Sequence, residues 1–318
     1  MRPHQSTPSH TSIAVADTAY KLVTEPDQGL TAIYNLLSSA KKSIDITMYE
    51  LSDETVTGLL TKAVAAGVSV RVILDQNEEK TRNTAAYNAL TAAKAGVHWA
   101  NPAFAVTHQK TITVDRATSA IMTLNLAAKD YPTSRDFAVI TGNAADVAAI
   151  VATFEADFTN TAIHPPAGEN LVWSPANSRS ALLGLIGGAS KSLLISQEEF
   201  SDTGMANAVK AALKRGVSVR LVQENQNNKF TSILNQLKAA GAHIAVYTST
   251  EPTSHYIHAK TVLADYGTER ARLFLGSENF SATSLDKNRE LGLIFDDENC
   301  MASVAATLSA DFTHGAAF

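Results

Sequence analysis

The chain has 318 residues, of which 45% are hydrophobic and 18% are charged, a composition typical of a globular protein with a sizeable buried core. No apolar run approaches the roughly 20 residues that a membrane-spanning helix needs, which argues against integral membrane insertion. The formal net charge of −5 argues against a protein dedicated to duplex nucleic acid, and the single cysteine, Cys300, excludes an internal disulfide or a cysteine-based metal cluster.

The amino-terminal stretch is predicted to be a loose tail. Residues 1–17 are polar, contain prolines and have no continuous apolar core of signal-peptide length. We therefore expect a flexible tail on a soluble protein that is either cytoplasmic or secreted after removal of a signal.

Helices and strands are predicted to alternate through the first half of the chain. A helix over about 27–41 leads into a strand at 43–49, and a second helix begins at Asp53 and closes at Gly67, a residue type favoured just past a helix end. The remaining predicted elements, in chain order, are a strand at 68–74, a helix at 83–95, strands at 108–115, 120–124 and 136–141, and a helix at 144–158.

The second half of the chain repeats the first. The stretch that begins at Lys41 matches the stretch that begins at Ser190, 149 residues further on. A shared "ADFT", at Ala156 and Ala310, has an offset of 154. A tandem duplication with a small insertion in the second copy explains both offsets.

The repeated order of elements predicts the fold. Helices that alternate with buried strands indicate an α/β sandwich in each copy. We expect two pseudo-symmetric α/β lobes, residues 18–163 and 178–318, joined by a proline-containing linker over 164–177.

One motif, H-x-K-x₄-D, occurs at corresponding positions of the two copies, in residues 108–115 and 258–265. The histidine and lysine of each motif are two residues apart, so in a strand they project from one face: His108 with Lys110, and His258 with Lys260. Asp115 and Asp265 follow their histidines by an odd number of positions, which favours the opposite face or the strand end. Holding a turn is the favoured interpretation for these two aspartates, over direct chemistry.

Further polar residues match downstream of each motif. They are Thr123, Asn125 and Asp136 in the first copy, and Ser277, Asn279 and Glu290 in the second. Together with the two motifs, these residues resemble the phospholipase D superfamily over nearly the whole chain. One departure is that Met122-Thr123 stands where the second copy has the usual Gly276-Ser277, although threonine keeps the hydroxyl.

The resemblance implies one active site shared by both lobes at their interface, with the residues of both motifs in it, Asp115 and Asp265 included. It assigns the nucleophile to His108, which would form a phosphohistidine, and the acid/base role to His258. The lysines would bind the non-bridging phosphate oxygens, the hydroxyls and asparagines would add hydrogen bonds, and Asp136 and Glu290 would accept from the imidazole Nδ1 atoms. The scheme needs no metal and no cofactor.

The charge balance of the chain bears on the type of phosphodiester. The acidic balance and the absence of Lys/Arg runs favour hydrolysis or transfer of a phospholipid headgroup. We further expect a monomer that contacts the membrane peripherally. A metal-independent nuclease is the alternative, and an inactive phosphate-binding module is a third interpretation. Glu50 and Glu199 correspond under the 149 offset, and they are interpreted either as contacts to a cationic headgroup or as structural hydrogen-bond partners.

Overall fold

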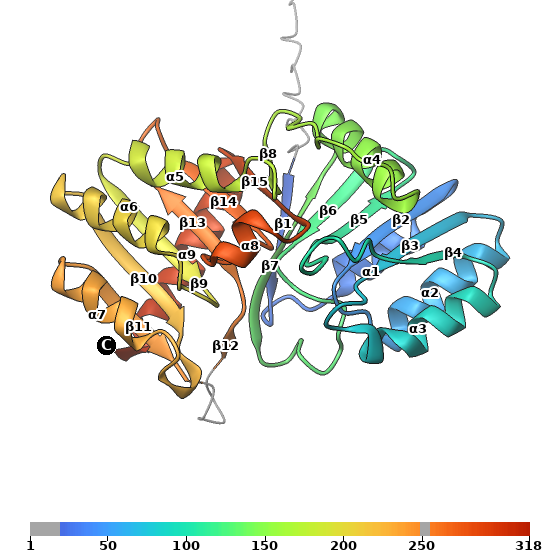
Figure 1. Ribbon diagram of the computed structural model, residues 1–318, viewed down its shortest axis with the longest axis horizontal. Coiled ribbons are helices and arrows are strands. Elements are labelled where there is room, and N and C mark those ends of the chain that lie inside the picture. The colour runs from blue at the N-terminus through green and yellow to red at the C-terminus, as the bar shows by residue number, and fades with distance from the viewer. Residues whose placement is uncertain (1–19, 249–254) are drawn as a thin grey trace, which may run out of the picture.

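The computed structural model describes residues 20–248 and 255–318, which form two α/β lobes side by side (Figure 1). Each lobe is built around one mixed sheet, and the two sheets contain the two copies of the duplication. The predicted fold of two tandem α/β lobes is therefore confirmed. The tail predicted over 1–17 lies outside the described residues.

The first sheet has the strand order β1-β7-β6-β5-β2-β3-β4. Its strands are β1 (Tyr20–Glu25), β2 (Ser43–Met48), β3 (Ser69–Leu74), β4 (Gly96–Trp99), β5 (Lys110–Val114), β6 (Thr118–Met122) and β7 (Ser134–Thr141). Strands β2, β3 and β4 pair in parallel, and the other pairs on this path are antiparallel. One face carries α1 (Thr31–Ser38), α2 (Glu54–Ala65) and α3 (Lys80–Ala92), and the opposite face carries α4 (Ala144–Phe158) (Figure 1).

The second sheet has the strand order β16-β11-β10-β9-β13-β14-β15-β8. Its strands are β8 (Leu171–Ser174), β9 (Ser192–Gln197), β10 (Ser218–Glu224), β11 (His243–Tyr247), β13 (Lys260–Ala264), β14 (Arg272–Gly276), β15 (Glu290–Phe295) and β16 (Ala316–Ala317). The helical elements of this lobe are α5 (Ser178–Gly188), α6 (Thr203–Lys214), η1 (Gln226–Asn228), α7 (Thr231–Ala239), α8 (Ala282–Asp286) and α9 (Glu298–His314). The short strand β12 (Tyr256–Ile257) leaves this lobe and pairs with β7 of the first sheet.

Equivalent local signals start and stop the equivalent helices α2 and α6. The side chain of Asp53 accepts hydrogen bonds from the first turn of α2, and that of Asp202 does so for α6. Gly67 and Gly216 follow the two helices with φ angles of +86° and +91°, a region that favours glycine. The two copies of the duplication thus share the residues that start and end these helices.

Three strands depart from the predicted pattern. β1 and β4 were not expected, and β4 spans only four residues, too few to show a clear alternation. β8 lies within the predicted linker 164–177, yet all four of its residues are buried and it closes the edge of the second sheet beside β15. The prolines around β8 are typical of turns, and for this reason the sequence pattern predicted a linker here rather than a strand.

The two lobes share a hydrophobic core. One cluster lies under α1 to α3 and a second under α5 to α7, but a third contains residues of both lobes. Phe137 and Ile150 of the first lobe belong to it, as do Trp173, Leu273 and Val304 of the second. Burial of this apolar surface fixes one lobe against the other, so side chains from both can be held in one site.

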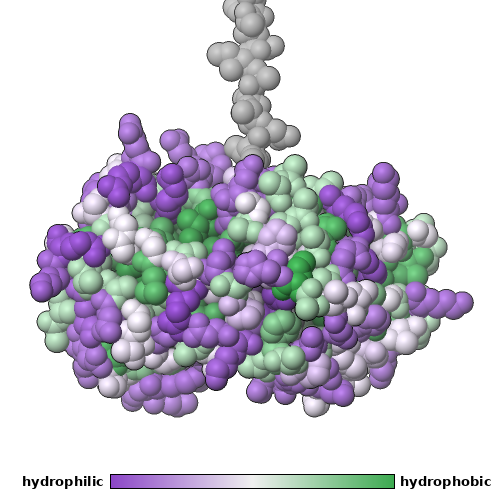
Figure 2. Space-filling model, turned by 45° about the horizontal axis from the view of Figure 1, so that its top comes forward, coloured by the Kyte–Doolittle hydropathy of each residue, from purple (hydrophilic) through white to green (hydrophobic). Residues whose placement is uncertain are grey.

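The surface of the described residues is mostly polar. Figure 2 shows one face, on which hydrophilic residues are widespread and hydrophobic ones occur in separate groups between them. Tyr266 is the one exposed large hydrophobic side chain in the described ranges. Within the same ranges, none of the helices has both the length and the apolar character required for a membrane span.

Candidate active site

The two motif histidines come from different lobes and line one cleft at the lobe interface. Each is carried there by a segment that docks on the opposite lobe through its backbone. The amide of His108 donates to the carbonyl of Arg289 at 2.9 Å, and the amide of Arg289 donates to Val106 at 3.0 Å. The second copy repeats this exchange, since β12 pairs with β7 and the amide of Ala259 donates to Arg135 at 2.9 Å.

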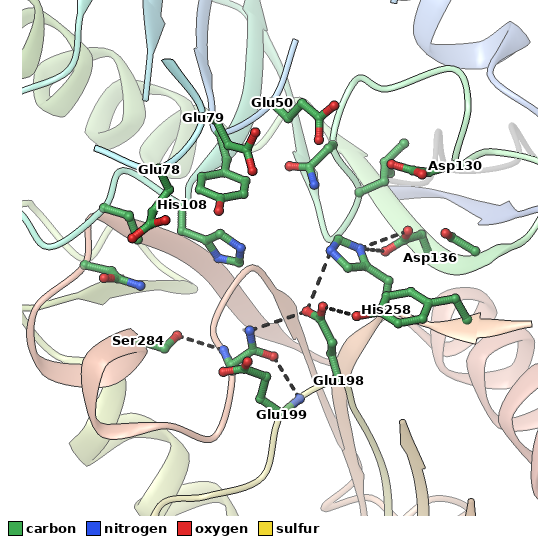
Figure 3. A pocket seen from close by; sticks show the side chains of 18 of the residues that line it. Glu50, Glu78, Glu79, His108, Asp130, Asp136, Glu198, Glu199, His258 and Ser284 are labelled. Carbon is green, nitrogen blue, oxygen red and sulfur yellow. Dashed lines mark hydrogen bonds and ion pairs between the residues drawn. The ribbon is translucent and has the colours of Figure 1, made fainter. Parts of the chain in front are cut away.

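This docking brings each imidazole to a carboxylate of the other lobe. Nδ1 of His108 lies 2.9 Å from Oε2 of Glu290, which is 182 residues away in sequence. Nδ1 of His258 lies 2.8 and 3.0 Å from the two oxygens of Asp136. A carboxylate at Nδ1 favours the tautomer that leaves Nε2 without a proton. Both imidazoles point into the same cleft from opposite sides (Figure 3).

Each of these carboxylates is held by further donors. The hydroxyl of Thr123 donates to Oδ1 of Asp136 and accepts from the amide of Phe137 at 2.9 Å. Glu290 accepts at Oε1 from the hydroxyl of Ser284 at 2.6 Å and from the amide group of Asn288 at 2.8 Å. The carboxylates are therefore fixed in position before any substrate binds.

Ser284 and Asn288 were not among the predicted site residues. Asn288 stands two positions before Glu290 in a strand-like stretch, so side-chain alternation could have indicated it. Ser284 lies in α8, which has no counterpart helix in the first lobe, and comparison of the two copies could not indicate it.

The two motif lysines are fully buried next to the histidines, but their surroundings differ. Nζ of Lys110 donates to the carbonyl of His108 at 2.6 Å and lies 5.0 Å from the ring centre of Tyr49. Nζ of Lys260 lies 2.7 Å from a carboxylate oxygen of Glu198. Burial, together with the charge of Lys260, lowers the pKa of Lys110 to about 7. Burial and the charge of Lys110 lower the pKa of His108 below its usual value.

The predicted hydrogen-bonding residues divide into two groups. Asn125 and Asn279 line the cleft, and Oδ1 of Asn125 is buried with no hydrogen-bond partner in the described part of the chain. Thr123 and Ser277 lie behind the cleft instead. The hydroxyl of Ser277 bonds to the backbone of Leu291, at 3.2 Å from its amide and 3.4 Å from its carbonyl.

The motif aspartates lie at the far ends of their strands. The carboxylate of Asp115 accepts from the backbone amides of residues 41 to 43, and that of Asp265 accepts from the amides of residues 190 to 192. Partial burial would raise the pKa of Asp115, but these backbone donors lower it. Both aspartates have positive φ angles and neither lines the cleft. This geometry fits the turn-holding interpretation.

The cleft has a volume of about 690 Å³, within the range of pockets that bind small molecules, and its lining is strongly acidic. In the described residues, eight acidic side chains line it, against two basic ones other than histidine, Arg82 and Lys129. The acidic residues are Glu25, Glu50, Glu78, Glu79, Asp130, Asp136, Glu198 and Glu199. The described residues contain no group of three or more potential ligands, from histidine, cysteine, aspartate and glutamate, with a geometry that could hold a metal ion.

Glu50 and Glu199 already have cationic partners from the protein. Glu50 lies 3.3 Å from Lys129 and 3.5 Å from Arg82, whereas Glu199 lies 2.8 Å from Lys229. These contacts favour the structural interpretation of the two glutamates.

Comparison with known proteins identifies the family of the chain. The family model described as "Cardiolipin synthase, PLD-like domain" matches residues 33–160 and 182–314, once in each lobe. Cardiolipin synthase A of Pseudomonas aeruginosa is 30% identical over 148 residues, which are 46% of this chain and 28% of that relative. The match thus spans little more than a quarter of the relative's length.

Two solved structures share the fold of the whole chain. Phosphatidylserine synthase from Haemophilus influenzae Rd KW20 has a TM-score of 0.72 and 13% identity, over 94% of this chain and 87% of that one. Polyphosphate kinase from Porphyromonas gingivalis has a TM-score of 0.74 and 14% identity, over 97% of this chain and 50% of that one. At these identities the likeness shows the fold alone.

Proposed function

The chain belongs to the family of cardiolipin synthase, PLD-like domains, and we propose that it is a phosphodiesterase that hydrolyses phospholipids or transfers their phosphatidyl group through a phosphohistidine. One observation carries the proposal: two imidazoles from opposite lobes face one cleft, each with Nδ1 held by a carboxylate of the other lobe. Two such imidazoles are what a two-step displacement at phosphorus requires.

In the first step, Nε2 of His108 attacks phosphorus. The P–N bond forms, the bond from phosphorus to the headgroup oxygen breaks, and His258 gives its proton to that oxygen. The lowered pKa of His108 supports its role as the nucleophile, because it keeps the imidazole unprotonated over a wider pH range. Glu198, whose Oε2 lies 3.7 Å from Nε2 of His258, attracts the positive charge of a protonated His258.

In the second step, water or an alcohol attacks the phosphohistidine. His258 takes the proton from the incoming oxygen, a new P–O bond forms, and the P–N bond to His108 breaks. Lys110, buried beside His108, and the amide of Asn125 in the cleft lining would stabilise the charge that develops on the non-bridging oxygens. An alcohol that competes with water would give a transfer product.

The acidic lining of the cleft supports a phospholipid over a nucleic acid. A nucleic acid presents a row of phosphates, and proteins bind it with clustered lysine and arginine. Here the acidic side chains outnumber the basic ones in the cleft, so a chain of phosphates would be repelled on either side of the one that reacts. A phospholipid carries a single phosphodiester between groups that are neutral or cationic, so the acidic side chains of the cleft repel it less.

The proposal is tested in two stages. Hydrolysis of bis(p-nitrophenyl) phosphate in the presence of EDTA, with His108→Ala and His258→Ala as controls, separates an enzyme from a binding module. Vesicles of phosphatidylcholine and phosphatidylethanolamine are then compared with single-stranded DNA over a salt series. We expect headgroup release, and phosphatidylethanol when ethanol is added. Salt-sensitive cleavage of DNA without headgroup release would replace the lipid substrate by a nucleic acid.

A further inference from the structure

The two halves of the cleft differ at one pair of corresponding positions. Tyr49 follows β2 and Glu198 follows β9, and the two residues match under the offset of 149. In the first half the neighbour of Lys110 is therefore an aromatic ring, 5.0 Å from Nζ. In the second half the neighbour of Lys260 is a carboxylate, 2.7 Å from Nζ.

The carboxylate of Glu198 lies among the donors that would bind a phosphate. Its Oε2 is 2.7 Å from Nζ of Lys260, 3.5 Å from Nδ2 of Asn279 and 3.7 Å from Nε2 of His258. Its Oε1 accepts from the hydroxyl of Tyr256 at 2.6 Å. Figure 3 shows Glu198 directed from below toward His258, inside the cleft.

A non-bridging oxygen of a bound phosphate would need the position that Oε2 of Glu198 occupies beside Lys260. Charge-assisted hydrogen bonds from an ammonium to an anionic oxygen are about 2.7–2.9 Å long, the distance that Oε2 of Glu198 has from Lys260. Two anionic oxygens cannot share that position, because like charges in contact repel strongly in a poorly solvated cleft.

We propose that Glu198 occupies the second-lobe half of the phosphate site and competes with the substrate phosphate for Lys260. The proposal rests on the function proposed above and deepens it. A phosphodiester first engages the first-lobe half, where His108 lines the cleft and a ring rather than a carboxylate neighbours Lys110, and it reaches Lys260 only when Glu198 turns away. Glu198 thus lowers the affinity of the cleft for phosphate.

The carboxylate of Glu198 stays ionised at neutral pH. Burial would raise the pKa of Glu198, but the positive charges of Lys260 and His258 outweigh burial and lower it well below its usual range. Glu198 is therefore an anion whenever a phosphodiester is one.

The direct test is the binding of inorganic phosphate, measured by isothermal titration calorimetry at constant ionic strength. Glu198→Gln keeps the shape of the side chain and removes its charge, and we expect it to bind phosphate about tenfold more tightly than the wild type or better. Glu199→Gln is the matched control, because Glu199 lines the same cleft but is paired with Lys229. This control should change the affinity by less than about threefold.

The outcomes separate the inference from a general effect of charge. Equal gains in the two glutamine variants would show that Glu198 acts only as one of many acidic residues, and this would overturn the proposal. Unchanged or weaker phosphate binding by Glu198→Gln would overturn it too. If that variant does not fold, as judged by circular dichroism, Glu198→Ala replaces it with the same expected gain.

Hydrolysis of bis(p-nitrophenyl) phosphate by the same proteins keeps this inference distinct from the proposed function. Activity in the wild type without a gain in phosphate binding by Glu198→Gln would leave the phosphodiesterase intact and remove the role of Glu198. A gain in binding without any hydrolysis would leave Glu198 as the competitor at an anion site and remove the phosphodiesterase.

Discussion

Arg135 of the first lobe and Asp311 of the second form a buried, two-pronged ion pair across the lobe interface, with Nε 2.7 Å from Oδ2 and Nη2 3.0 Å from Oδ1. Arg289 and Asp157 form the same pair in the opposite direction, at 3.0 Å for both contacts. Each arginine directly precedes the carboxylate that holds an imidazole, Asp136 or Glu290. The ion pairs that join the lobes therefore also help to position the carboxylates that contact the two imidazoles.

The first prediction concerns the Arg135–Asp311 pair. Asp311→Asn leaves a buried arginine short of one carboxylate, and we expect it to lower the free energy of unfolding by about 3 kcal/mol. Urea unfolding followed by circular dichroism measures this loss. The exposed pair of Arg272 and Asp296, 3.4 Å apart, provides the control, and Asp296→Asn should cost less than about 1 kcal/mol. Equal effects of the two substitutions would show that the interface pair does not stabilise the protein.

The second prediction is a fall in kcat/KM as pH rises above about 7, the pKa of Lys110. The lowered pKa means that Lys110 loses its positive charge earlier than an exposed lysine would, and with it the stabilisation of the phosphate. In Lys110→Arg the guanidinium stays charged, so the alkaline fall should move to higher pH even if the overall rate is lower. Rates with bis(p-nitrophenyl) phosphate between about pH 5 and pH 9 test this.

Lys129 provides the control for the pH profile. Lys129→Arg changes a half-exposed lysine at the cleft and should leave the shape of the profile as it is. An alkaline fall that is the same in wild type and Lys110→Arg would assign it to another group.

Third, the cleft should be assembled within a single chain. His108→Ala and His258→Ala each remove one chemical role and should lower turnover by about 10²–10⁴-fold or more. A mixture of the two variants should be no more active than either alone, because each histidine meets a carboxylate of its own chain. Recovery of about a quarter or more of the wild-type rate on mixing would mean that lobes from different chains combine.

Fourth, the hydroxyl of Thr123 should matter, and the identity of the residue that carries it should not. Thr123→Ser keeps the donor to Asp136 and should stay within about threefold of the wild-type kcat. Thr123→Val keeps the shape but leaves Asp136 without this donor, and it should lower kcat by about 10–100-fold. Similar rates for the serine and valine variants would rule out a role for this hydrogen bond.

The sequence was sufficient to predict the two lobes and the two histidines that line the cleft, because both depend on patterns that repeat. Spacing indicated that His108 and Lys110 belong together, and matching the copies indicated Asp136 and Glu290. Spacing could not indicate that each carboxylate serves the histidine of the other lobe. That exchange depends on how β12 docks on β7 and how the backbone near His108 docks on Arg289.

Comparison of the copies was also limited to what they have in common. It drew attention to Glu50 and Glu199, which match, and away from Tyr49 and Glu198, which do not. In the structure, Glu198 is the glutamate that contacts Lys260 and faces His258. Differences between duplicated lobes are invisible to a search for repeats, although they are where the two halves of a site can specialise.

The contrast between Tyr49 and Glu198 has a genetic consequence. A protein made of two identical subunits has one codon for both positions, so a glutamate beside one lysine is a glutamate beside both. Two lobes in one reading frame have two codons, and selection can act on each of them separately. The half of the cleft at Tyr49 can keep its affinity for phosphate, while the half at Glu198 acquires a carboxylate that competes with phosphate. In a symmetric dimer, one point mutation would change both halves together.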